Sequence, residues 1–357
     1  MPFANLDNPI VPVFDVSIDG TPLTAEAKAH ISEVTVDESV EWPSMFNLEI
    51  RSSDDLDDEN LWIDDERIFG IGKAVEVKLG YGDKLESLFK GEITGLEPSF
   101  QASRLPVMMV RGYDRRHRLQ RGRKTRTFVQ QKDSQIASKV ASEAGLTAEV
   151  KDSSVTHDYV VQANQTDLEF LQERALRINF EVVVEDKKLL FRPVSNDGGE
   201  VLTITTDDHL LEFHPHLTST QQVGEVTVRG WSPKDKKEII GQAQVSDVRG
   251  EMGGTTLGPK LAKTAFGASV GLLSEYPVMT QAEADQIAKA QFNDIALALI
   301  DGDGVCFGRT DLRAGKVIKI DGVGKRFSGQ YYVTGAVHRY NEHDGYRTQF
   351  TVRRNAV

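Results

Sequence analysis

The chain has 357 residues, of which 39% are hydrophobic and 27% charged, with a formal net charge of -12. This length exceeds one ordinary core and predicts two or three domains, and the composition is that of ordered globular domains. Cys306 is the only cysteine, which excludes an internal disulfide and predicts synthesis in a reducing cytoplasm. Neither a signal-peptide pattern nor a run of roughly 18 apolar residues occurs, so no membrane span is predicted.

The first hundred residues have the alternation of β-strands. In "VFDVSIDG", apolar and polar residues alternate up to a turn signal at Asp19-Gly20. The runs "AVEVKLGYG", "FKGEITGLEPSF" and "LPVMMVRG" continue the pattern. We therefore expect residues 72–112 to form a three-stranded antiparallel meander with one buried face.

Residues 113–200 change to a mixed pattern. "DSQIASKVASEAGL" predicts a helix with Asp133 or Ser134 as N-cap and Gly145 as its stop. "NQTDLEFLQERALRINF" predicts another helix, opened by a capping box of Thr166 and Glu169. "FEVVVEDKKLLFRP" predicts two short strands around a turn. This segment is therefore expected to form a compact α/β unit.

Strands return in residues 201–357. A Gly-rich stretch, 249–277, interrupts them and is long enough to favour a functional or mobile loop, or a disordered surface excursion. A helix is predicted over 280–299, opened by Thr280 and Glu283, and three strands follow it.

The same series of short motifs occurs in the first third of the chain and again near its C-terminus. Each copy has Phe-x-Gly (89–91 and 327–329), then Thr-Gly (94–95 and 334–335), then Val-Arg (110–111 and 352–353). A repeated series of this kind indicates a duplicated β unit, with the α/β segment inserted between the copies.

Charge is distributed unevenly along the chain. The segment 111–126 is strongly basic, and its basic residues are Arg111, Arg115, Arg116, Arg118, Arg121, Arg123, Lys124 and Arg126. An acidic run lies further upstream and includes Asp54, Asp55, Asp57, Asp58 and Glu59. The basic stretch fits a seam between domains or subunits, an ordinary solvated surface, or a contact with nucleic acid or cargo in transit.

No catalytic, cofactor or metal site emerges from the motifs. His209, His214 and His216 cluster, but histidines at a strand end are more often surface polar residues than metal ligands. "GGTTLGPKLA" lacks the spacing of a phosphate-binding loop. Cys306 is expected to be a buried thiol. We therefore expect no enzymatic activity and no cofactor, with a nucleic-acid-binding β protein or a cell-wall-active hydrolase as the alternatives.

Five separated segments resemble the phage late control protein D and VgrG-like baseplate hub proteins of contractile tails, tailocins and contractile injection systems. They are "VRGYDRRHRLQRGRKTRTF", "DSQIASKVASEAGL", "NQTDLEFLQERALRINFEVVVEDKKLLFRP", "EVTVRGWSPKDKKEIIG" and "FSGQYYVTGAVHRYNEHDGYRTQFTVRRN". The resemblance implies a mainly β (α+β) fold, with two related antiparallel β-barrel domains, 1–112 and 201–357, and an α/β insertion, 113–200. It also implies a homotrimeric symmetry adaptor between a six-fold inner tube and a three-fold spike.

The partners implied are further copies of the chain, the inner tube protein, a spike protein or spike domain, and other baseplate proteins. The implied location is a tail-like particle assembled after synthesis in the bacterial cytoplasm. Because the sequence stops after the second barrel, we expect either that a separate chain supplies the spike or that this sequence is only the hub portion of a longer protein. The basic stretch and the acidic run then become candidate partner-binding residues, and reversing Arg115, Arg116 and Arg118 to glutamate is expected to impair assembly while leaving the monomer folded.

Overall fold

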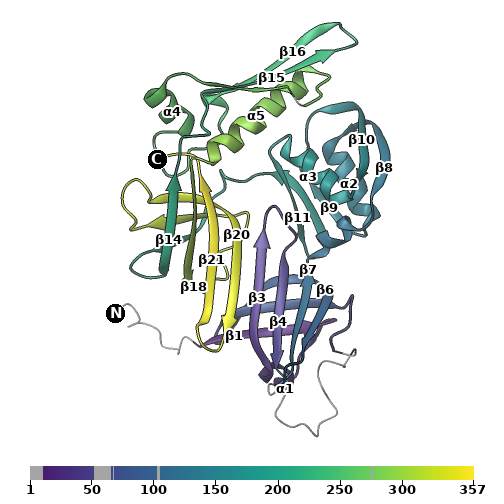
Figure 1. Ribbon diagram of the computed structural model, residues 1–357, viewed down its shortest axis with the longest axis vertical. Helices are drawn as coiled ribbons and strands as arrows, with labels where there is room; N and C mark the ends of the chain where they lie inside the picture. Colours follow the sequence, from purple (N-terminus) through teal and green to yellow (C-terminus); the bar gives the residue numbers. More distant parts are fainter. Residues whose placement is uncertain (1–10, 52–65, 67, 103–104, 275) are drawn as a thin grey trace.

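The computed structural model describes residues 11–51, 66, 68–102, 105–274 and 276–357. The protein is mainly β, with large antiparallel sheets. Figure 1 shows the first β unit at the bottom, the second β unit above it on the left and the α/β unit on the right. This confirms the predicted fold class of two related antiparallel β units with an α/β insertion between them. No helix in these ranges is long and apolar enough to cross a membrane.

The first β unit contains the meander predicted for residues 72–112. Its elements are β1 (Pro12–Ile18), β2 (Thr21–Pro22), α1 (Ala25–Ala29), β3 (Ile31–Ser39), β4 (Met45–Arg51), β5 (Ala74–Tyr81), β6 (Lys84–Ser99) and β7 (Val107–Tyr113). The strands pair in the order β3-β4-β7-β6-β5-β1-β2, so that β5, β6 and β7 are consecutive antiparallel neighbours. Alternate apolar side chains, among them Val34, Leu48 and Val110, form the buried core.

The α/β unit has both predicted helices and the predicted strand pair. Its elements are η1 (Arg115–Gln120), β8 (Lys124–Lys132), α2 (Asp133–Glu143), β9 (Thr147–Val150), β10 (Thr156–Gln165), α3 (Asp167–Leu176), β11 (Phe180–Glu185) and β12 (Lys188–Pro193). The capping box of Thr166 and Glu169 is confirmed. The N-cap of α2 is Lys132 and not the predicted Asp133 or Ser134, because the Asp133 carboxylate instead accepts hydrogen bonds from buried side chains.

The second β unit is built from strands that come both before and after the long helix α5 (Gln281–Leu297). They are β13 (Glu200–Thr205), β14 (Leu210–Leu217), β18 (Ile300–Phe307), β19 (Val317–Asp321), β20 (Gly329–Asn341) and β21 (Gly345–Arg354). They pair in the order β14-β18-β21-β20-β19-β13. Tyr331, Phe350 and Val352 lie in the core of this unit.

The remaining strands form a separate projection, at the top of Figure 1. It contains β15 (Glu225–Ser232), β16 (Lys237–Gln244), η2 (Val245–Asp247), α4 (Gly258–Phe266), β17 (Val270–Leu273) and α5 (Gln281–Leu297). Here the structure differs from expectation, because β15 and β16 pair with β17 in their own sheet and not in the second barrel. The Gly-rich stretch 249–277 likewise contains a helix and a strand. The helix predicted over 280–299 is confirmed as α5.

Glycine determines how closely the projection packs. At Gly241 on β16, an added Cβ would lie 2.3 Å from backbone atoms of Ala284 on α5. Only a residue without a side chain allows this approach. The contact brings α5 against the sheet, and the first turn of α5 lies beside the α/β unit.

The two β units share one continuous sheet. Strand β3 pairs antiparallel with the second part of β20, from the pair Gly335–Ser39 to the pair Asn341–Glu33. Figure 1 shows these two strands side by side at the centre of the molecule. The second β unit is therefore attached to the first through backbone hydrogen bonds as well as through side chains.

The predicted duplication is visible in the strand order. The order β3-β4-β7-β6-β5-β1 in the first unit matches β14-β18-β21-β20-β19-β13 in the second. Each unit also has a bulge at the Thr-Gly motif, with Thr94 the extra residue in β6 and Thr334 the extra residue in β20. A second pair of bulges, at Ser32 in β3 and Leu211 in β14, also occupies equivalent places.

Other parts of the repeated motif series are not structurally equivalent. Arg111 lies opposite Gly95, just after the bulge, whereas Arg353 lies opposite Tyr332, before it. The end strands also differ, because β1 runs antiparallel to β5 while β13 runs parallel to β19. The copies therefore share five strands, from β3 to β5 and from β14 to β19 in the two orders, together with both bulges, and have diverged at the end strands β1 and β13.

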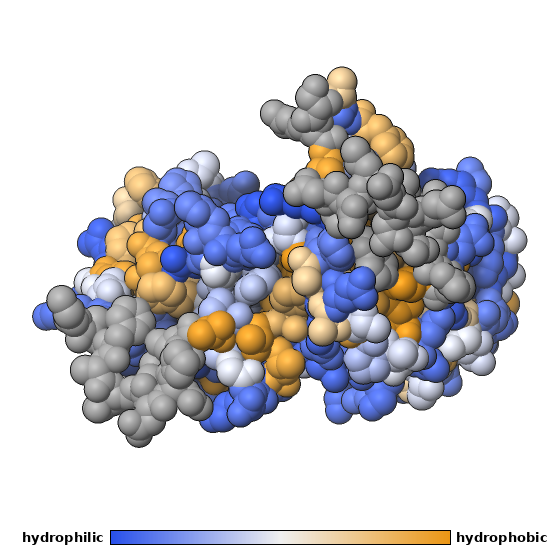
Figure 2. Space-filling model, turned by 90° about the horizontal axis from the view of Figure 1, so that it is seen from below, coloured by the Kyte–Doolittle hydropathy of each residue, from blue (hydrophilic) through white to orange (hydrophobic). Residues whose placement is uncertain are grey.

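The surface carries separate hydrophobic patches. Figure 2 shows the lower end of the molecule in Figure 1, where orange patches interrupt a mainly blue surface. Exposed large hydrophobic side chains of the first β unit include Ile71, Leu85 and Phe100. Scattered exposed hydrophobic residues are normal, so a contact surface has to be argued from geometry as well as from hydropathy.

Candidate functional site

The basic stretch lies where the first β unit meets the α/β unit. Arg111 is on β7, Arg115, Arg116 and Arg118 are on η1, and Lys124 and Arg126 are on β8. Asp114 is the N-cap of η1, and its carboxylate accepts hydrogen bonds from the backbone N–H groups of Arg116 and Ser44, each at 2.7 Å. This single acid therefore fixes the direction in which the chain leaves β7 and enters η1, and with it the positions of the basic side chains.

Three side chains of η1 converge on Glu92 of β6. Arg115 Nε lies 3.2 Å from Glu92 Oε1, and His117 Nε2 and Arg118 Nε lie 2.9 and 3.0 Å from Oε2. Arg115 also pairs with Asp186, in the turn between β11 and β12. Burial alone would raise the pKa of Glu92, but hydrogen bonds from Arg118 and His117 outweigh it and lower the pKa to about 2.

Arg116 is the most deeply buried member of the stretch, with 1% of its surface exposed. Its Nε lies 2.9 Å from Asp114 Oδ2. Its Nη2 donates to Ser39 O and Ser44 Oγ, both at 3.1 Å, and its Nη1 donates to Val182 O of β11 at 3.4 Å. One guanidinium thus joins the end of β3 to the α/β unit.

The remaining members lie closer to the surface. Lys124 Nζ and Arg126 Nη2 lie 2.6 and 2.8 Å from the two carboxylate oxygens of Asp167, at the start of α3. Arg123 pairs with Glu169 at 3.0 Å. Arg111 pairs with Glu97 at 3.1 Å, and Arg121 is exposed.

The structure therefore brings most of the predicted basic residues onto carboxylates of their own chain. The acidic run, Asp54, Asp55, Asp57, Asp58 and Glu59, lies outside the described residues, and its pairing with the basic stretch stays a prediction. One expectation needs correction. Reversing Arg115 and Arg116 would place glutamates at buried positions beside Glu92 and Asp114, and reversing the more exposed Arg118 would set a third against Glu92. The monomer is therefore not expected to stay folded.

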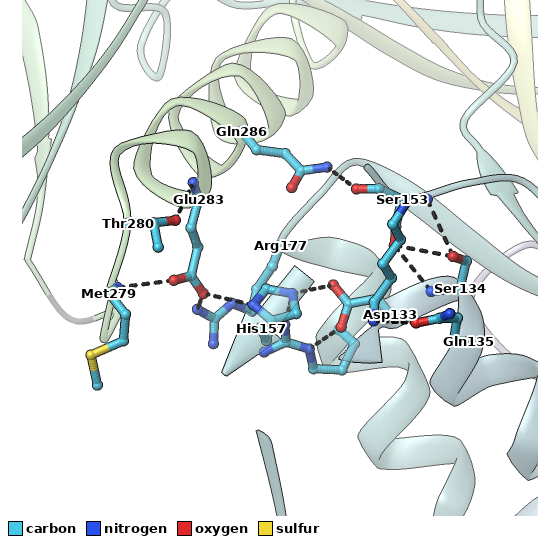
Figure 3. Close-up of polar contacts among 12 residues, drawn as sticks. Asp133, Ser134, Gln135, Ser153, His157, Arg177, Met279, Thr280, Glu283 and Gln286 are labelled. Atoms are coloured by element: carbon cyan, nitrogen blue, oxygen red, sulfur yellow. Dashed lines mark hydrogen bonds and ion pairs between the residues drawn. The ribbon is translucent and has the colours of Figure 1, made fainter. Parts of the chain in front are cut away.

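A second ionic cluster, not anticipated from the sequence, joins the α/β unit to α5 (Figure 3). His157 Nε2 lies 3.1 Å from Asp133 Oδ2, and Arg174 Nε lies 2.6 Å from Asp133 Oδ1. Across the junction, Glu283 Oε1 lies 3.1 Å from Arg177 Nη2 and 3.5 Å from His157 Nδ1. All five side chains are buried.

Hydrogen bonds from side chains to backbone carbonyls cross the same junction. Gln286 Nε2 of α5 donates to Ser153 O at 3.0 Å, and Arg177 Nη2 donates to Pro277 O at 3.0 Å. Glu283 also accepts a hydrogen bond from Met279 N at 2.9 Å. The sequence indicated Glu283 only through its place in the capping pattern of α5. Its side chain instead faces the α/β unit.

The ionisation of this cluster follows from its partners. Burial alone would lower the pKa of His157, but hydrogen bonds to Asp133 and Glu283 outweigh it and raise the pKa above the ordinary 6.5, although Arg174 opposes the positive charge. Burial would raise the pKa of both carboxyls, but His157 and Arg174 lower that of Asp133, and His157 and Met279 N–H lower that of Glu283. The charged forms of all three groups are therefore favoured.

We expect a pH dependence of stability that His157 carries at the alkaline side. Because its folded pKa is raised, its contribution is fully present below about 6.5 and is lost as pH rises through the folded value. Replacing His157 with glutamine should cost about 1–3 kcal/mol at pH 5.5, and less at pH 8.5. Urea unfolding of both proteins at the two pH values measures this, and an equal cost at both would contradict it.

The other polar groups considered from the sequence do not assemble into a reactive centre in the described part of the chain. His214 and His216 are exposed beside Asp303 and Asp301, and His209 lies beside Asp208. No group of three or more metal-type ligands occurs in the described ranges. Burial raises the pKa of the Cys306 thiol to about 12, so it remains protonated and poorly nucleophilic.

Known proteins share this architecture. The family model described as the Alg8 N-terminal domain matches residues 9–342. The 43 kDa tail protein of prophage MuSo2 from Shewanella oneidensis has a TM-score of 0.72 at 13% identity, over 96% of this chain and 98% of that chain. The tail protein from Neisseria meningitidis MC58 has a TM-score of 0.69 at 13% identity, over 96% of each chain.

A third similar structure is the E. coli c3393 protein. It is described as a component of the type VI secretion system with structural similarity to T4 bacteriophage tail proteins gp27 and gp5. Its TM-score is 0.62 at 14% identity, over 96% of this chain and 77% of that chain. No curated protein matches the chain by sequence. At these identities the solved structures show a shared fold.

Proposed function

We propose that this chain, which belongs to the family described as the Alg8 N-terminal domain, is a structural component of a contractile tail-like particle, the central hub that joins tube to spike. Its fold is shared with phage tail proteins and with a type VI secretion component. In this role the protein acts by assembly and catalyses no reaction.

The observation that carries the proposal is the duplicated β unit. Two units with the same strand order and equivalent bulges are joined edge to edge within one chain. A homotrimer would present six such units around its axis, matching a six-fold tube, and would keep three-fold symmetry for a spike. A chain with two similar units is what an adaptor between these symmetries requires.

The proposed partners are two further copies of the chain, the inner tube protein, the spike and neighbouring baseplate proteins. Within this arrangement the basic stretch has an internal role, because it fixes the α/β unit against the first β unit. Its exposed members, such as Arg121 and Arg123, remain proposed partner contacts. The particle is proposed to be assembled from chains made in the bacterial cytoplasm.

We expect the purified chain to form trimers. Light scattering at low and moderate salt, on the chain alone and with its candidate spike, should give a three-fold multiple of 39.6 kDa. A monomer under every condition would remove the symmetry-adaptor mechanism.

A further inference from the structure

Strand β20 has two neighbours on one side, and the bulge at Thr334 divides it between them. Before the bulge β20 pairs with β19, and after it β20 pairs with β3. Strand β6 has the equivalent bulge at Thr94, and the part before it pairs with β5. Beyond the bulge, residues 95–99 pair with β7 on one side, and no strand of the described residues lies along their other side.

Strand β14 is the counterpart of β3. Each begins its unit, pairs antiparallel with the next strand and carries a bulge at the equivalent place. Unlike β3, β14 ends the strand order, so one of its edges has no strand beside it in the described part of the chain. Within the described residues, the protein therefore makes one copy of this junction internally and leaves both halves of the other copy with unpaired edges. Such edges are templates for another strand.

We propose that β14 of one chain pairs antiparallel with residues 95–99 of a second copy of this chain, reproducing between chains the junction of β3 with β20. The inference deepens the proposed hub function and rests on it for the number of copies. Because the two edges are different surfaces, the contact is head-to-tail, and repeated contacts of this kind form a ring when the rotation closes. With three chains, the ring contains six β units.

The register follows from counting across each unit, starting just after its bulge. In the first unit, the residues facing one another on successive strands are Gly95, Arg111, Asn47 and Thr35. In the second unit, the corresponding row is Gly335, Thr351, Asp303 and His214. His214 on β14 therefore occupies the place of Thr35 on β3.

The internal junction then fixes which residues meet between chains. Thr35 faces Arg339, four residues beyond Gly335. Transferred to the second junction, this places His214 opposite Ser99, four residues beyond Gly95. It also places His216 opposite Glu97.

The charged side chains suit this register. Glu97 is 55% exposed and His216 is 70% exposed, so both are available for a contact across the junction. Glu97 is already bonded to Arg111 on its own sheet, and His216 lies 3.6 Å from Asp301. Joining the strands would give a row of alternating charge, since acid and base then follow one another across four strands.

The opposite face of the same strands is apolar. The register places Phe100, which is 66% exposed, opposite Phe213, and Leu96 opposite Leu217. Phe213 and Leu217 pack against the core of the second unit, so the junction would extend that core. A slip of one residue would put apolar side chains against charged ones, and this fixes the register.

Each free edge contains one proline, and the register places Pro98 opposite Pro215. Neither residue has an N–H group, so this position makes no ladder hydrogen bond and the pairing depends on the positions beside it. Prolines on edges also discourage indiscriminate extension of sheets. The two edges are therefore suited to one specific partner strand.

An engineered disulfide tests the register directly. The variant Glu97→Cys with His216→Cys places two cysteines opposite each other, at about 4.5–5.5 Å between Cα atoms, within the range that a disulfide spans. Native Cys306 is fully buried and does not compete. The matched control is Glu97→Cys with His214→Cys, which moves one cysteine two residues along the same face, to about 7–8 Å. Mild oxidation is followed by denaturing, non-reducing electrophoresis, and light scattering measures the native mass.

The expected result is a trimeric mass for both variants, with covalent species of two and three chains for the first and loss of these species for the control. A trimeric mass without crosslinks, or with equal crosslinking in both variants, would overturn the strand pairing while leaving the proposed hub function intact. A monomeric mass for the unmodified chain would overturn both.

Discussion

Replacing Arg116 with alanine is expected to lower the free energy of unfolding by about 3–5 kcal/mol, because a buried ion pair loses one partner. Arg116 is almost fully buried, and its guanidinium bonds Asp114 and three groups of the surrounding chain. Without it, the Asp114 carboxylate stays buried with fewer donors. Urea unfolding of the purified protein measures the loss.

Arg123→Ala is the matched control. It makes the same change in the same stretch, but Arg123 is half-exposed in its pair with Glu169, so a cost of about 0–1 kcal/mol is expected. Equal costs for the two variants would mean that the buried bonds of Arg116 do not hold the domains together. A folded, stable Arg116→Ala protein would restore the view that the whole stretch serves external partners.

Replacing Glu283 with alanine is the second change with a large expected effect, again about 3–5 kcal/mol. The loss leaves Arg177 buried without its carboxylate and removes one of the two acids beside His157. Because these contacts join α5 to the α/β unit, hydrogen exchange should rise near the start of α5 and around residue 157. Hydrogen exchange by mass spectrometry, together with urea unfolding, detects both effects.

The control for this variant is Asp294→Ala on the same helix. Asp294 is 62% exposed, and its contact with Arg353 is 3.7 Å, so a change within about 1 kcal/mol is expected. If hydrogen exchange at the junction were the same in both variants, the cluster would not be what docks α5.

Local patterns in the sequence were sufficient for most individual elements. The meander of β5, β6 and β7, helix α3 with its capping box, and helix α5 all follow from periodicity and end signals within a few residues. The assignment of β15 and β16 to the second barrel was wrong, because alternation identifies a strand without identifying its neighbours. Their sheet is set by packing against α5, which the strand pattern does not encode.

The ionic contacts could not be predicted from the sequence for a related reason. Glu92 lies 23 to 26 residues before its three basic partners, which reach it only because β6 and β7 pair and η1 follows β7. His157 and Glu283 are still further apart in sequence and meet only through docking of two units. The basic stretch was noticed for its composition, but its partners depend on the tertiary fold.

The junction between β3 and β20 also has a consequence for synthesis. Ser39 pairs with Gly335, so β3 leaves the ribosome nearly 300 residues before its partner. At about 5–20 residues per second, the edge of β3 stays unpaired for about 15 to 60 s while the intervening units fold. During this interval the edge of β3 has no partner strand of its own chain and is a template for other strands. The covering of this edge therefore waits for the last part of translation.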